Sequence, residues 1–205
     1  GRPFCTRTTD GGKTWEFVSW IGPEPSTPRG YAIMPSAVRL SPTELLVMVR
    51  RKEVTDGESK YWIDPSYSHD NGETWHLQKE PVIENGGNPP SMITLEDGRI
   101  ALTYGYRRPP YGIRARLSSD KGRTWDEEII LRDDGGNWDL GYPRTVQRLD
   151  GKTVTVYYFN EAADKERYIA ATIWNPGPKR TICDPVEQHI IGPWDLVPPE
   201  KPGRE

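Results

Sequence analysis

Residues 68–75 read SHDNGETW, and the chain contains this pattern three times. Residues 8–15 read TTDGGKTW and residues 118–125 read SSDKGRTW, so all three stretches share Ser/Thr-x-Asp-x-Gly-x-Thr-Trp. Each residue type suits a turn, because an Asp side chain accepts hydrogen bonds from the amides that follow it and Gly adopts positive φ. The Trp adds a large apolar surface that can pack against the sheet carrying the turn. One copy would indicate a hairpin with an aromatic anchor, whereas three copies indicate a structural repeat.

The conserved spacing inside the three stretches predicts a structural role for the residues that recur in them. We expect the Asp to accept hydrogen bonds, the Gly to adopt the turn conformation and the Trp to act as a buried anchor. The residues concerned are Asp10, Gly12, Trp15, Asp70, Gly72, Trp75, Asp120, Gly122 and Trp125.

The composition favours many short strands over long helices. The 205 residues include 8 Trp, 10 Tyr, 20 Gly and 20 Pro, and 34% of them are hydrophobic. The net charge of -3 is spread along the chain, so no basic surface for nucleic acid is expected, and no apolar run could span a membrane. The three His are scattered, so we predict no metal and no cofactor. Cys5 and Cys183 are interpreted as free buried thiols.

Between the repeated turns, the chain reads as blocks of short apolar strands. The blocks begin at Pro35, Pro90 and Pro143, which lie 55 and 53 residues apart. Four strands per repeat at this period predict a β-propeller, since a β-sandwich would not need near-identical turns in each unit. The expected strands are 35–40, 45–50, 61–68 and 75–82, then 90–95, 100–106, 113–117 and 128–131, then 143–149, 153–159 and 168–174.

The blocks predict how the chain is organised. Residues 1–175 are expected to form about three to three and a half blades, and residues 176–205 a Pro-rich C-terminal extension with one candidate strand at 186–191. Propellers close with about four or more blades. We therefore expect the chain to be part of a larger propeller that needs its missing N-terminal blades to close. The alternative is a chain whose sheet edges are covered by partners.

The repeated turn resembles the Asp-box, or bacterial neuraminidase repeat, of sialidases and related propellers. Residues 141–146, 149–152 and 168–171 also resemble the closing blade of sialidase-type proteins. This resemblance covers residues 1–175. It implies an all-β, sialidase-like β-propeller, six-bladed when complete, whose Asp-boxes join the third and fourth strands of a blade on the side away from the active site. It is more specific for the superfamily than for the reaction, since Asp-boxes also occur in lyases, other glycosidases and non-catalytic propellers.

The face opposite the Asp-boxes is where we expect chemistry. Alternating strand direction places the starts of first strands and the ends of second strands on that face. An arginine-rich face suits an anionic sugar, because a guanidinium group binds a carboxylate through two parallel hydrogen bonds. The candidate substrate-binding residues there are Arg50, Arg107, Arg108, Arg144, Glu161 and Trp138, the last for stacking on a sugar. The charges interpreted as solvated are Arg51, Lys52, Arg114 and Arg116.

The resemblance also implies catalytic roles. Tyr142 stands where sialidases have their Tyr nucleophile, and a phenol needs a neighbouring base to take its proton. Arg50 resembles the second of the family's three carboxylate-binding arginines, and Arg107 or Arg108 the third. The first arginine and the Asp acid/base would belong to N-terminal blades outside this chain. The alternative for Tyr142 is a residue of the site wall.

Two positions depart from the sialidase pattern. Met34 and Pro35 stand where the family has the Glu that activates the Tyr, so Glu161 or another carboxylate would have to substitute. Arg144 stands where sialidases commonly have small residues, and it could bind an acidic group itself.

These features predict a fragment of a glycoside hydrolase of the exo-α-sialidase type, whose partner is a glycan or acidic sugar. Two alternatives stay open: a polysaccharide lyase or other glycosidase acting on uronic-acid glycans, and a non-catalytic glycan- or protein-binding propeller. The chain by itself is expected to be inactive, because part of any central site would be absent.

Overall fold

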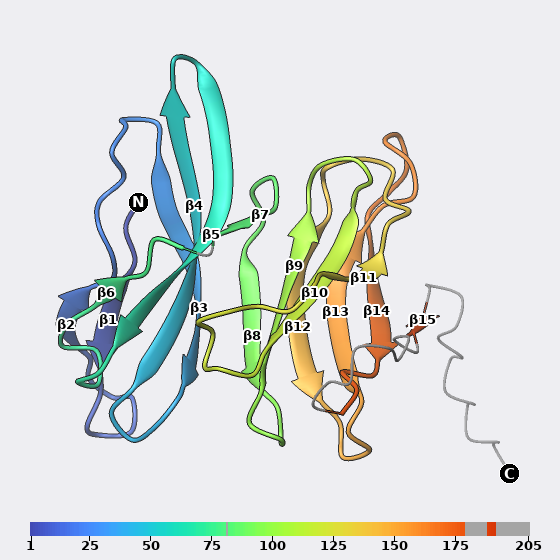
Figure 1. Ribbon diagram of the computed structural model, residues 1–205. Coiled ribbons are helices and arrows are strands. Elements are labelled where there is room, and N and C mark those ends of the chain that lie inside the picture. The colour runs from blue at the N-terminus through green and yellow to red at the C-terminus, as the bar shows by residue number, and fades with distance from the viewer. Residues whose placement is uncertain (81, 179–187, 192–205) are drawn as a thin grey trace, which may run out of the picture.

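The computed structural model describes residues 1–80, 82–178 and 188–191, and the described residues form strands and loops without a helix (Figure 1). The strands are β1 (Phe4–Arg7), β2 (Glu16–Trp20), β3 (Tyr31–Arg39), β4 (Leu45–Thr55), β5 (Glu58–Ser68), β6 (His76–Leu77), β7 (Ile83–Glu84), β8 (Pro90–Thr94), β9 (Ile100–Tyr106), β10 (Gly112–Ser118), β11 (Ile129–Arg132), β12 (Gly141–Gln147), β13 (Thr153–Phe159), β14 (Tyr168–Trp174) and β15 (Gln188–Ile191).

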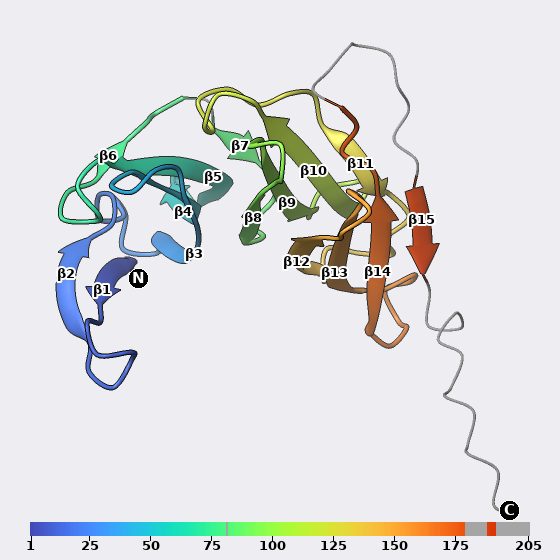
Figure 2. The same ribbon diagram turned by 90° about the horizontal axis from the view of Figure 1, so that it is seen from below.

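The strands build four antiparallel sheets. Their orders are β1-β2, then β3-β4-β5-β6 with β7 also on β5, then β8-β9-β10-β11, then β12-β13-β14-β15. Figure 2 shows these sheets side by side in an arc, with β3, β8 and β12 toward its concave side. This arrangement confirms an all-β, propeller-type fold, and the sheets agree with the predicted number of blades.

Most of the predicted extension, residues 176–205, lies outside the described residues, as does Cys183. Within it, β15 pairs with β14 as the fourth strand of the last sheet. The boundary at residue 175 therefore stays a prediction. Cys5 is a partly buried free thiol.

The core lies between the sheets. One cluster joins the second and third sheets through Leu46, Met48, Ile63 and Leu102, among others. A second cluster joins the third and fourth sheets and includes the fully buried Trp174. Because neighbouring sheets cover both faces of the inner blades, strands such as β9 read as continuous apolar runs.

A buried hydroxyl chain also connects the third and fourth sheets. The Oγ1 atoms of Thr103 and Thr145 lie 2.7 Å apart, and those of Thr145 and Thr155 lie 2.9 Å apart. The indole Nε1 of Trp174 donates to Thr155 Oγ1 at 3.0 Å. These bonds satisfy polar groups that would otherwise be costly to bury between two sheets.

The three Asp-boxes have the same internal geometry and connect β1 to β2, β5 to β6 and β10 to β11. In the second box, Asp70 Oδ1 accepts from the Thr74 amide at 2.9 Å, and the Ser68 hydroxyl accepts from the Gly72 amide at 2.7 Å. The first and third boxes repeat both bonds, at 3.0 and 2.9 Å for the Asp and at 2.9 and 2.8 Å for the hydroxyl. The sequence therefore predicted the turn chemistry correctly.

Two of the boxes also dock on the preceding sheet. Gly122 packs against Leu46, and Tyr67 Oη donates to Lys121 O at 3.2 Å. In the second box, residues 68–75, the contact is with Ser19 of β2. Ser19 Oγ donates to Gly72 O and accepts from Trp75 Nε1 at 3.0 Å. The boxes thus fasten one blade to the next as well as closing their own turn.

Trp15 does not follow the prediction of a buried anchor, since 62% of it is exposed. Trp75 and Trp125 are partly buried and pack against core clusters. The difference follows from the sheets, because β1 and β2 are paired only with each other and offer Trp15 little to pack against.

Two further sequence interpretations were wrong. The predicted strands 45–50 and 61–68 were too short: β4 and β5 continue into a long hairpin whose turn, Asp56-Gly57, has φ of 52° and 83°. Asp-Gly suits this two-residue turn because both positions need positive φ. Arg51 and Arg114 are not solvated, with 3% and 2% exposed.

Carboxylates and backbone carbonyls accept hydrogen bonds from both buried arginines, although Nη2 of Arg51 has no partner. Arg51 Nε lies 3.0 Å from Asp64 Oδ2, and Arg114 Nε lies 3.1 Å from Glu128 Oε1. Neighbouring sheets cover both sides of the strands that carry them, so these side chains have no solvated face to occupy. Lys52 makes a cation–π contact, with Nζ 5.5 Å from the centroid of the Tyr61 ring.

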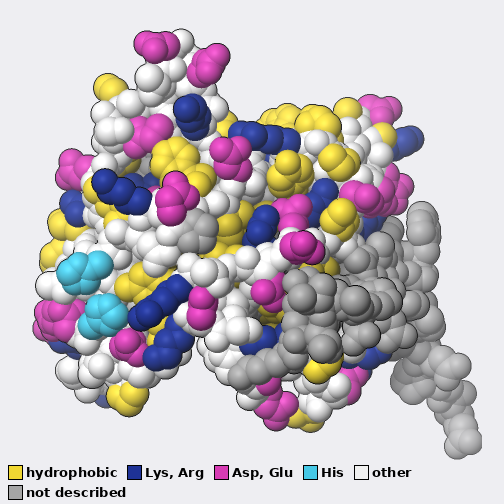
Figure 3. All heavy atoms as spheres, in the orientation of Figure 1, with side chains coloured by type: hydrophobic (Ala, Val, Ile, Leu, Met, Phe, Trp, Pro, Cys, Tyr) yellow, Lys and Arg dark blue, Asp and Glu magenta, His cyan; other side chains and the backbone are white. Residues whose placement is uncertain are grey.

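The surface carries charges of both signs. Figure 3 shows basic and acidic side chains interspersed over the face seen in Figure 1, with apolar side chains exposed between them. None of the described residues belongs to a helix long and apolar enough to cross a membrane.

Candidate functional site

The predicted functional residues lie at the end of the sheets opposite the Asp-boxes. Leu45 pairs with Ser68 and Ile100 pairs with Ser118, so the boxes after β5 and β10 lie beside the starts of β4 and β9. Arg50 lies in the middle of β4, away from the box, and Arg107 directly follows β9.

A cavity of about 400 Å³ opens at this end. It is lined by Tyr31, Arg50, Tyr61, Gly86, Gly87, Arg107, Tyr111 and Trp138. Tyr142 adjoins it, since its Oη is 3.4 Å from Arg50 Nη1 and its ring centroid is 5.7 Å from Arg107 Cζ. The structure therefore brings together four predicted residues: Tyr142, Arg50, Arg107 and Trp138.

Tyr142 is held in a strained backbone conformation. Its φ is 51°, beside Gly141 at 114°, and the register of β12 against β13 shifts between Gly141 and Arg144. A side chain at positive φ is energetically unfavourable, and such strain gathers at functional sites. A β-bulge also re-aims the side chain that it carries.

The fully buried Asn88 holds this bulge. Its Oδ1 accepts from the amides of Tyr142 at 3.1 Å and Gly105 at 3.0 Å, and its Nδ2 donates to Leu140 O at 3.0 Å. One side chain therefore ties the third sheet to the start of the fourth, directly beneath Tyr142.

Met34 occupies the equivalent position in the second sheet. It has φ of 53°, and the register of β3 against β4 shifts between Ile33 and Ser36. Arg50 Nη1 lies 3.3 Å from Met34 Sδ. The Met thus stands beside Arg50 and near Tyr142, where the resemblance implies a carboxylate.

The two site arginines differ in how they are held. Arg50 packs over the Tyr31 ring at 5.1 Å, its buried Nε has no hydrogen-bond partner, and no carboxylate among the described residues pairs with it. Arg107 donates to Leu140 O, Gly87 O and Tyr158 Oη at 3.1, 3.3 and 2.8 Å. Both keep further N–H groups for a ligand.

Asp139 and Tyr158 complete the site, and neither was singled out from the sequence. Tyr158 Oη donates to Asp139 Oδ1 at 2.8 Å, and Arg167 Nε donates to Asp139 Oδ2 at 3.0 Å. Burial, together with the hydrogen bond to Asp139, raises the pKa of Tyr158 to about 12. Tyr158 therefore stays protonated at neutral pH and links Arg107 to a carboxylate. The only signal in the sequence was the place of Asp139 between Trp138 and a predicted strand start.

The remaining predicted residues do not line this cavity. Arg108 pairs with Glu84 at 3.0 Å and lines a different cavity. Glu161 Oε1 accepts from Tyr168 Oη at 3.1 Å, so the structure gives it a partner other than Tyr142. Arg144 lies on the exposed side of β12, two residues beyond Tyr142, and donates to Pro143 O at 3.0 Å.

No group of three or more His, Cys, Asp or Glu is arranged to hold a metal ion in the part of the chain that the structure describes. The site can instead bind an anion, because it presents arginines without carboxylate partners beside aromatic rings.

Comparison with known structures supports the fold. A protein of unknown function from Dyadobacter fermentans is 29% identical, with a TM-score of 0.65 over 83% of this chain and 44% of its own length. A xylan β-1,4-xylosidase from Bacillus halodurans is 15% identical, with a TM-score of 0.54 over 93% of this chain and 36% of its own. The chain thus spans less than half of either protein. A search of curated proteins found no match.

Residues 2–156 match the family described as "BNR repeat-like domain". This stretch contains all three Asp-boxes together with Arg50, Arg107 and Tyr142. The chain therefore belongs to the BNR repeat-like domain family.

Proposed function

We propose that this chain is part of a propeller glycoside hydrolase that removes a terminal acidic sugar from a glycan, as an exo-α-sialidase does. The observation that carries the proposal is the meeting of Arg50, Arg107 and the strained Tyr142 at one cavity. Neither arginine is paired directly with a carboxylate among the described residues. Membership of the BNR repeat-like domain family and the likeness to a xylosidase fold are consistent with action on a glycan.

The arginines would bind the acid group of the sugar. Arg50 lines the cavity, and Arg144 projects from the same strand as Tyr142. Arg107 is fixed between the rings of Trp138 and Tyr142, at 5.5 and 5.7 Å, so it loses little freedom when a ligand binds. Trp138, 58% exposed, offers a face on which the sugar can stack.

Tyr142 would attack the anomeric carbon. Its phenol must lose a proton in this step, and Met34 cannot accept one. Asp139 connects to the site through Tyr158 and Arg107, so we assign it a positioning role. We expect the base and the general acid to come from blades outside this chain. Arg50, 3.4 Å from Tyr142 Oη, can stabilise negative charge that develops there in the transition state.

Met34 favours a second candidate function. With a thioether instead of a carboxylate beside Arg50, the site could bind an acidic glycan without cleaving it. A lyase or other glycosidase acting on uronic-acid glycans is the remaining alternative, with Arg144 neutralising the carboxylate.

The test is hydrolysis of a fluorogenic sialoside by the full-length protein and its Tyr142→Phe variant. We expect turnover by the wild type and a loss of about 10³-fold or more in kcat for the variant, because the nucleophile is removed. Tyr168→Phe, a Tyr outside the cavity, serves as the matched control and should retain activity.

The other outcomes assign the alternatives. Binding of sialic acid without turnover, lost in Arg50→Ala, would replace the hydrolase with a binding module. Unsaturated, ultraviolet-absorbing products from a uronate polymer would indicate a lyase.

A further inference from the structure

Three side chains form a row across β3, β4 and β5, on the long hairpin beyond Arg50. Tyr31 pairs with Lys52 across β3 and β4, and Lys52 pairs with Tyr61 across β4 and β5. Directly paired residues of neighbouring strands project to the same face of a sheet, so these three share one face, and we call them the hairpin row. Arg50, two residues before Lys52, lies on that face as well. Figure 1 shows the hairpin extending past the ends of the neighbouring sheets.

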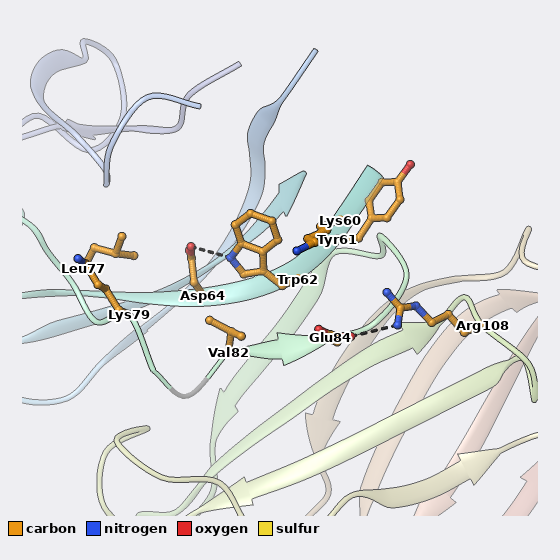
Figure 4. Close-up of a pocket in the computed structure, with 9 residues that line it drawn as sticks. All are labelled: Lys60, Tyr61, Trp62, Asp64, Leu77, Lys79, Val82, Glu84 and Arg108. Atoms are coloured by element: carbon orange, nitrogen blue, oxygen red, sulfur yellow. Dashed lines mark hydrogen bonds and ion pairs between the residues drawn. The ribbon is translucent and has the colours of Figure 1, made fainter. Parts of the chain in front are cut away.

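The opposite face of the hairpin holds a separate set of contacts. Trp62 Nε1 donates to Asp64 Oδ2 at 3.1 Å, and Figure 4 shows both residues on β5, joined by this hydrogen bond. Glu53 accepts from two groups of the loop before β3, at 2.9 and 2.8 Å. These residues alternate with Lys52 and Tyr61 along their strands, so their carboxylates face away from the row.

Lys52 is held in place by the two rings of the row. Its Nζ lies 6.0 Å from the centroid of the Tyr31 ring and 5.5 Å from that of the Tyr61 ring. The Tyr61 ring is itself fixed by Gly87, where a Cβ would stand 2.7 Å from a ring carbon. Among the described residues, no carboxylate forms an ion pair with Lys52. The ammonium group is therefore oriented by cation–π contacts and keeps N–H donors for a ligand.

The hairpin row borders the cavity of the candidate site. Its two rings line that cavity together with Arg50 and Arg107. Arg50 Cζ lies 5.1 Å from the centroid of the Tyr31 ring, and Arg107 Nη1 donates to Gly87 O at 3.3 Å. Three cations without a carboxylate paired directly to them in the described part of the chain thus surround one cavity, the third being the lysine of the row.

The charge of this cavity exceeds what one carboxylate can neutralise. A carboxylate carries a single negative charge, and Arg50 and Arg107, both in contact with Tyr142, already offer it two positive charges. Lys52 stands two residues beyond Arg50 on β4, which is about 7 Å along the strand. This offset is comparable to the length of one sugar unit, so the third cation is placed for the sugar that follows the terminal one.

Building on the proposed function, we propose that the hairpin row binds a second anionic group of the glycan, carried by the sugar next to the terminal acidic one. Lys52 would pair with that carboxylate or sulfate, and the ring of Tyr31 or Tyr61 would pack against the sugar that carries it. The preferred ligand then has anionic groups on two adjacent sugars. Lys52 determines this specificity and takes no part in the chemical step.

The test measures affinity, so it does not depend on turnover. Calorimetry on the full-length protein would compare sialyllactose, which has one carboxylate, with an α-linked sialic acid dimer and with sialyllactose sulfated on its galactose. The last two carry a second anionic group on the neighbouring sugar and distinguish a carboxylate from a sulfate. We expect at least one of them to bind about tenfold more tightly than sialyllactose, because it gains a charge-assisted hydrogen bond.

Variants locate the effect. Lys52→Met removes the charge and keeps an unbranched side chain between the rings, so it should abolish the preference and leave the affinity for sialyllactose unchanged. Lys52→Arg keeps the charge and should retain most of the preference. Lys60→Met removes an exposed lysine from the opposite face of the same hairpin, so it is the matched control and should keep the preference.

The results separate the two proposals. Equal affinity for all three ligands, or a preference that survives Lys52→Met, would overturn the role of the row, and hydrolysis of sialyllactose in that case would leave the hydrolase intact. A preference that is lost in Lys52→Met and kept in Lys60→Met, without any hydrolysis, would support the row and refute the hydrolase. Absence of binding by all three ligands would overturn both proposals.

Discussion

At the scale of single residues, the site depends on a few positions where the backbone is forced away from its preferred conformation. Tyr142 and Met34 both have positive φ, and only Tyr142 has a buried side chain, Asn88, that accepts a hydrogen bond from its amide. Substituting Tyr142 by another residue with a large side chain would keep a similar strain, whereas Gly would remove it. We infer that the conformation positions whatever side chain stands there, and that the phenol is what gives the position its chemistry.

Gly122 of the third Asp-box and Gly98 of the turn between β8 and β9 allow a test that separates backbone strain from packing. Gly122 has φ of 84° and packs on Leu46, whereas Gly98 has φ of 82° with open space where a Cβ would stand. We expect Gly98→Ala to lower the free energy of unfolding by about 1 kcal/mol, the cost of a side chain at positive φ. Gly122→Ala should cost a further 1–3 kcal/mol or so, because its methyl group collides with the neighbouring blade.

Urea unfolding of both variants measures this difference. Equal losses would show that the box does not fasten one blade to the next, and that its glycine serves only the turn.

At the scale of elements, the Asp-box is a turn whose stability requires an ionised carboxylate. Hydrogen bonds from the Thr74 side chain and amide, and then from Ser68, lower the pKa of Asp70 to about 2. The pKa values of Asp10 and Asp120 are lowered as well. An unfolded Asp has a pKa of about 3.9. Between pH of about 2 and about 4, the folded state therefore binds fewer protons at Asp70 than the unfolded state does.

This linkage predicts acid sensitivity. The stabilisation by Asp70 is fully present above pH of about 4 and is lost as pH falls through 2, because protonation removes the acceptor that the turn needs. We expect the melting temperature to fall steeply over that window. Asp70→Asn should lower the melting temperature at neutral pH and flatten the slope in acid. A slope identical to that of the wild type would contradict the role of the carboxylate.

The strands themselves were partly predictable. The predicted ranges 100–106, 153–159 and 168–174 agree with β9, β13 and β14 to the residue, because apolar runs there are bounded by clear turn residues. The long hairpin beyond Arg50 was missed, since its strands are polar and only the Asp56-Gly57 turn indicates them. The predicted strand 75–82 was also wrong, because β6 and β7 pair separately with β5 and a gap in pairing leaves no periodic pattern in the sequence.

At the scale of the whole molecule, the candidate site lies on the concave side of an arc of sheets. Figure 2 shows the described sheets as an arc that is open on its concave side, toward which β3, β8 and β12 face. The Arg50–Tyr142 contact joins the second sheet to the fourth across this side. A ligand bound there would have no described sheet opposite it.

We therefore expect the 205-residue chain alone to show no turnover of a fluorogenic sialoside, whereas the full-length protein does. The missing contacts would include the base and the general acid, so the loss should appear in kcat. Activity of the isolated chain equal to that of the full-length protein would contradict this prediction. It would mean that the nucleophile, the base and the general acid all lie within this chain.

Some properties followed from the sequence by itself. The Asp-boxes are local: the carboxylate, the hydroxyl and the glycine act within a few residues, so their spacing determined the turns, the repeat and the propeller fold. The arginines at the ends of the predicted strands 45–50 and 100–106 could be placed on one face by counting strands. The sequence could not predict which of these arginines would line the same cavity. Arg107 and Arg108 are adjacent in the chain, and yet they line different cavities.

Only the tertiary structure decided the rest. The partners of Tyr142 come from three sheets, and the Asn88, Tyr158 and Asp139 network is built from contacts between residues far apart in the chain. Burial of Arg51 and Arg114 depends on the neighbouring blades. Local patterns determine turns and strands because their forces act over a few residues. The site is set by the packing of blades, which brings together side chains that no local pattern relates.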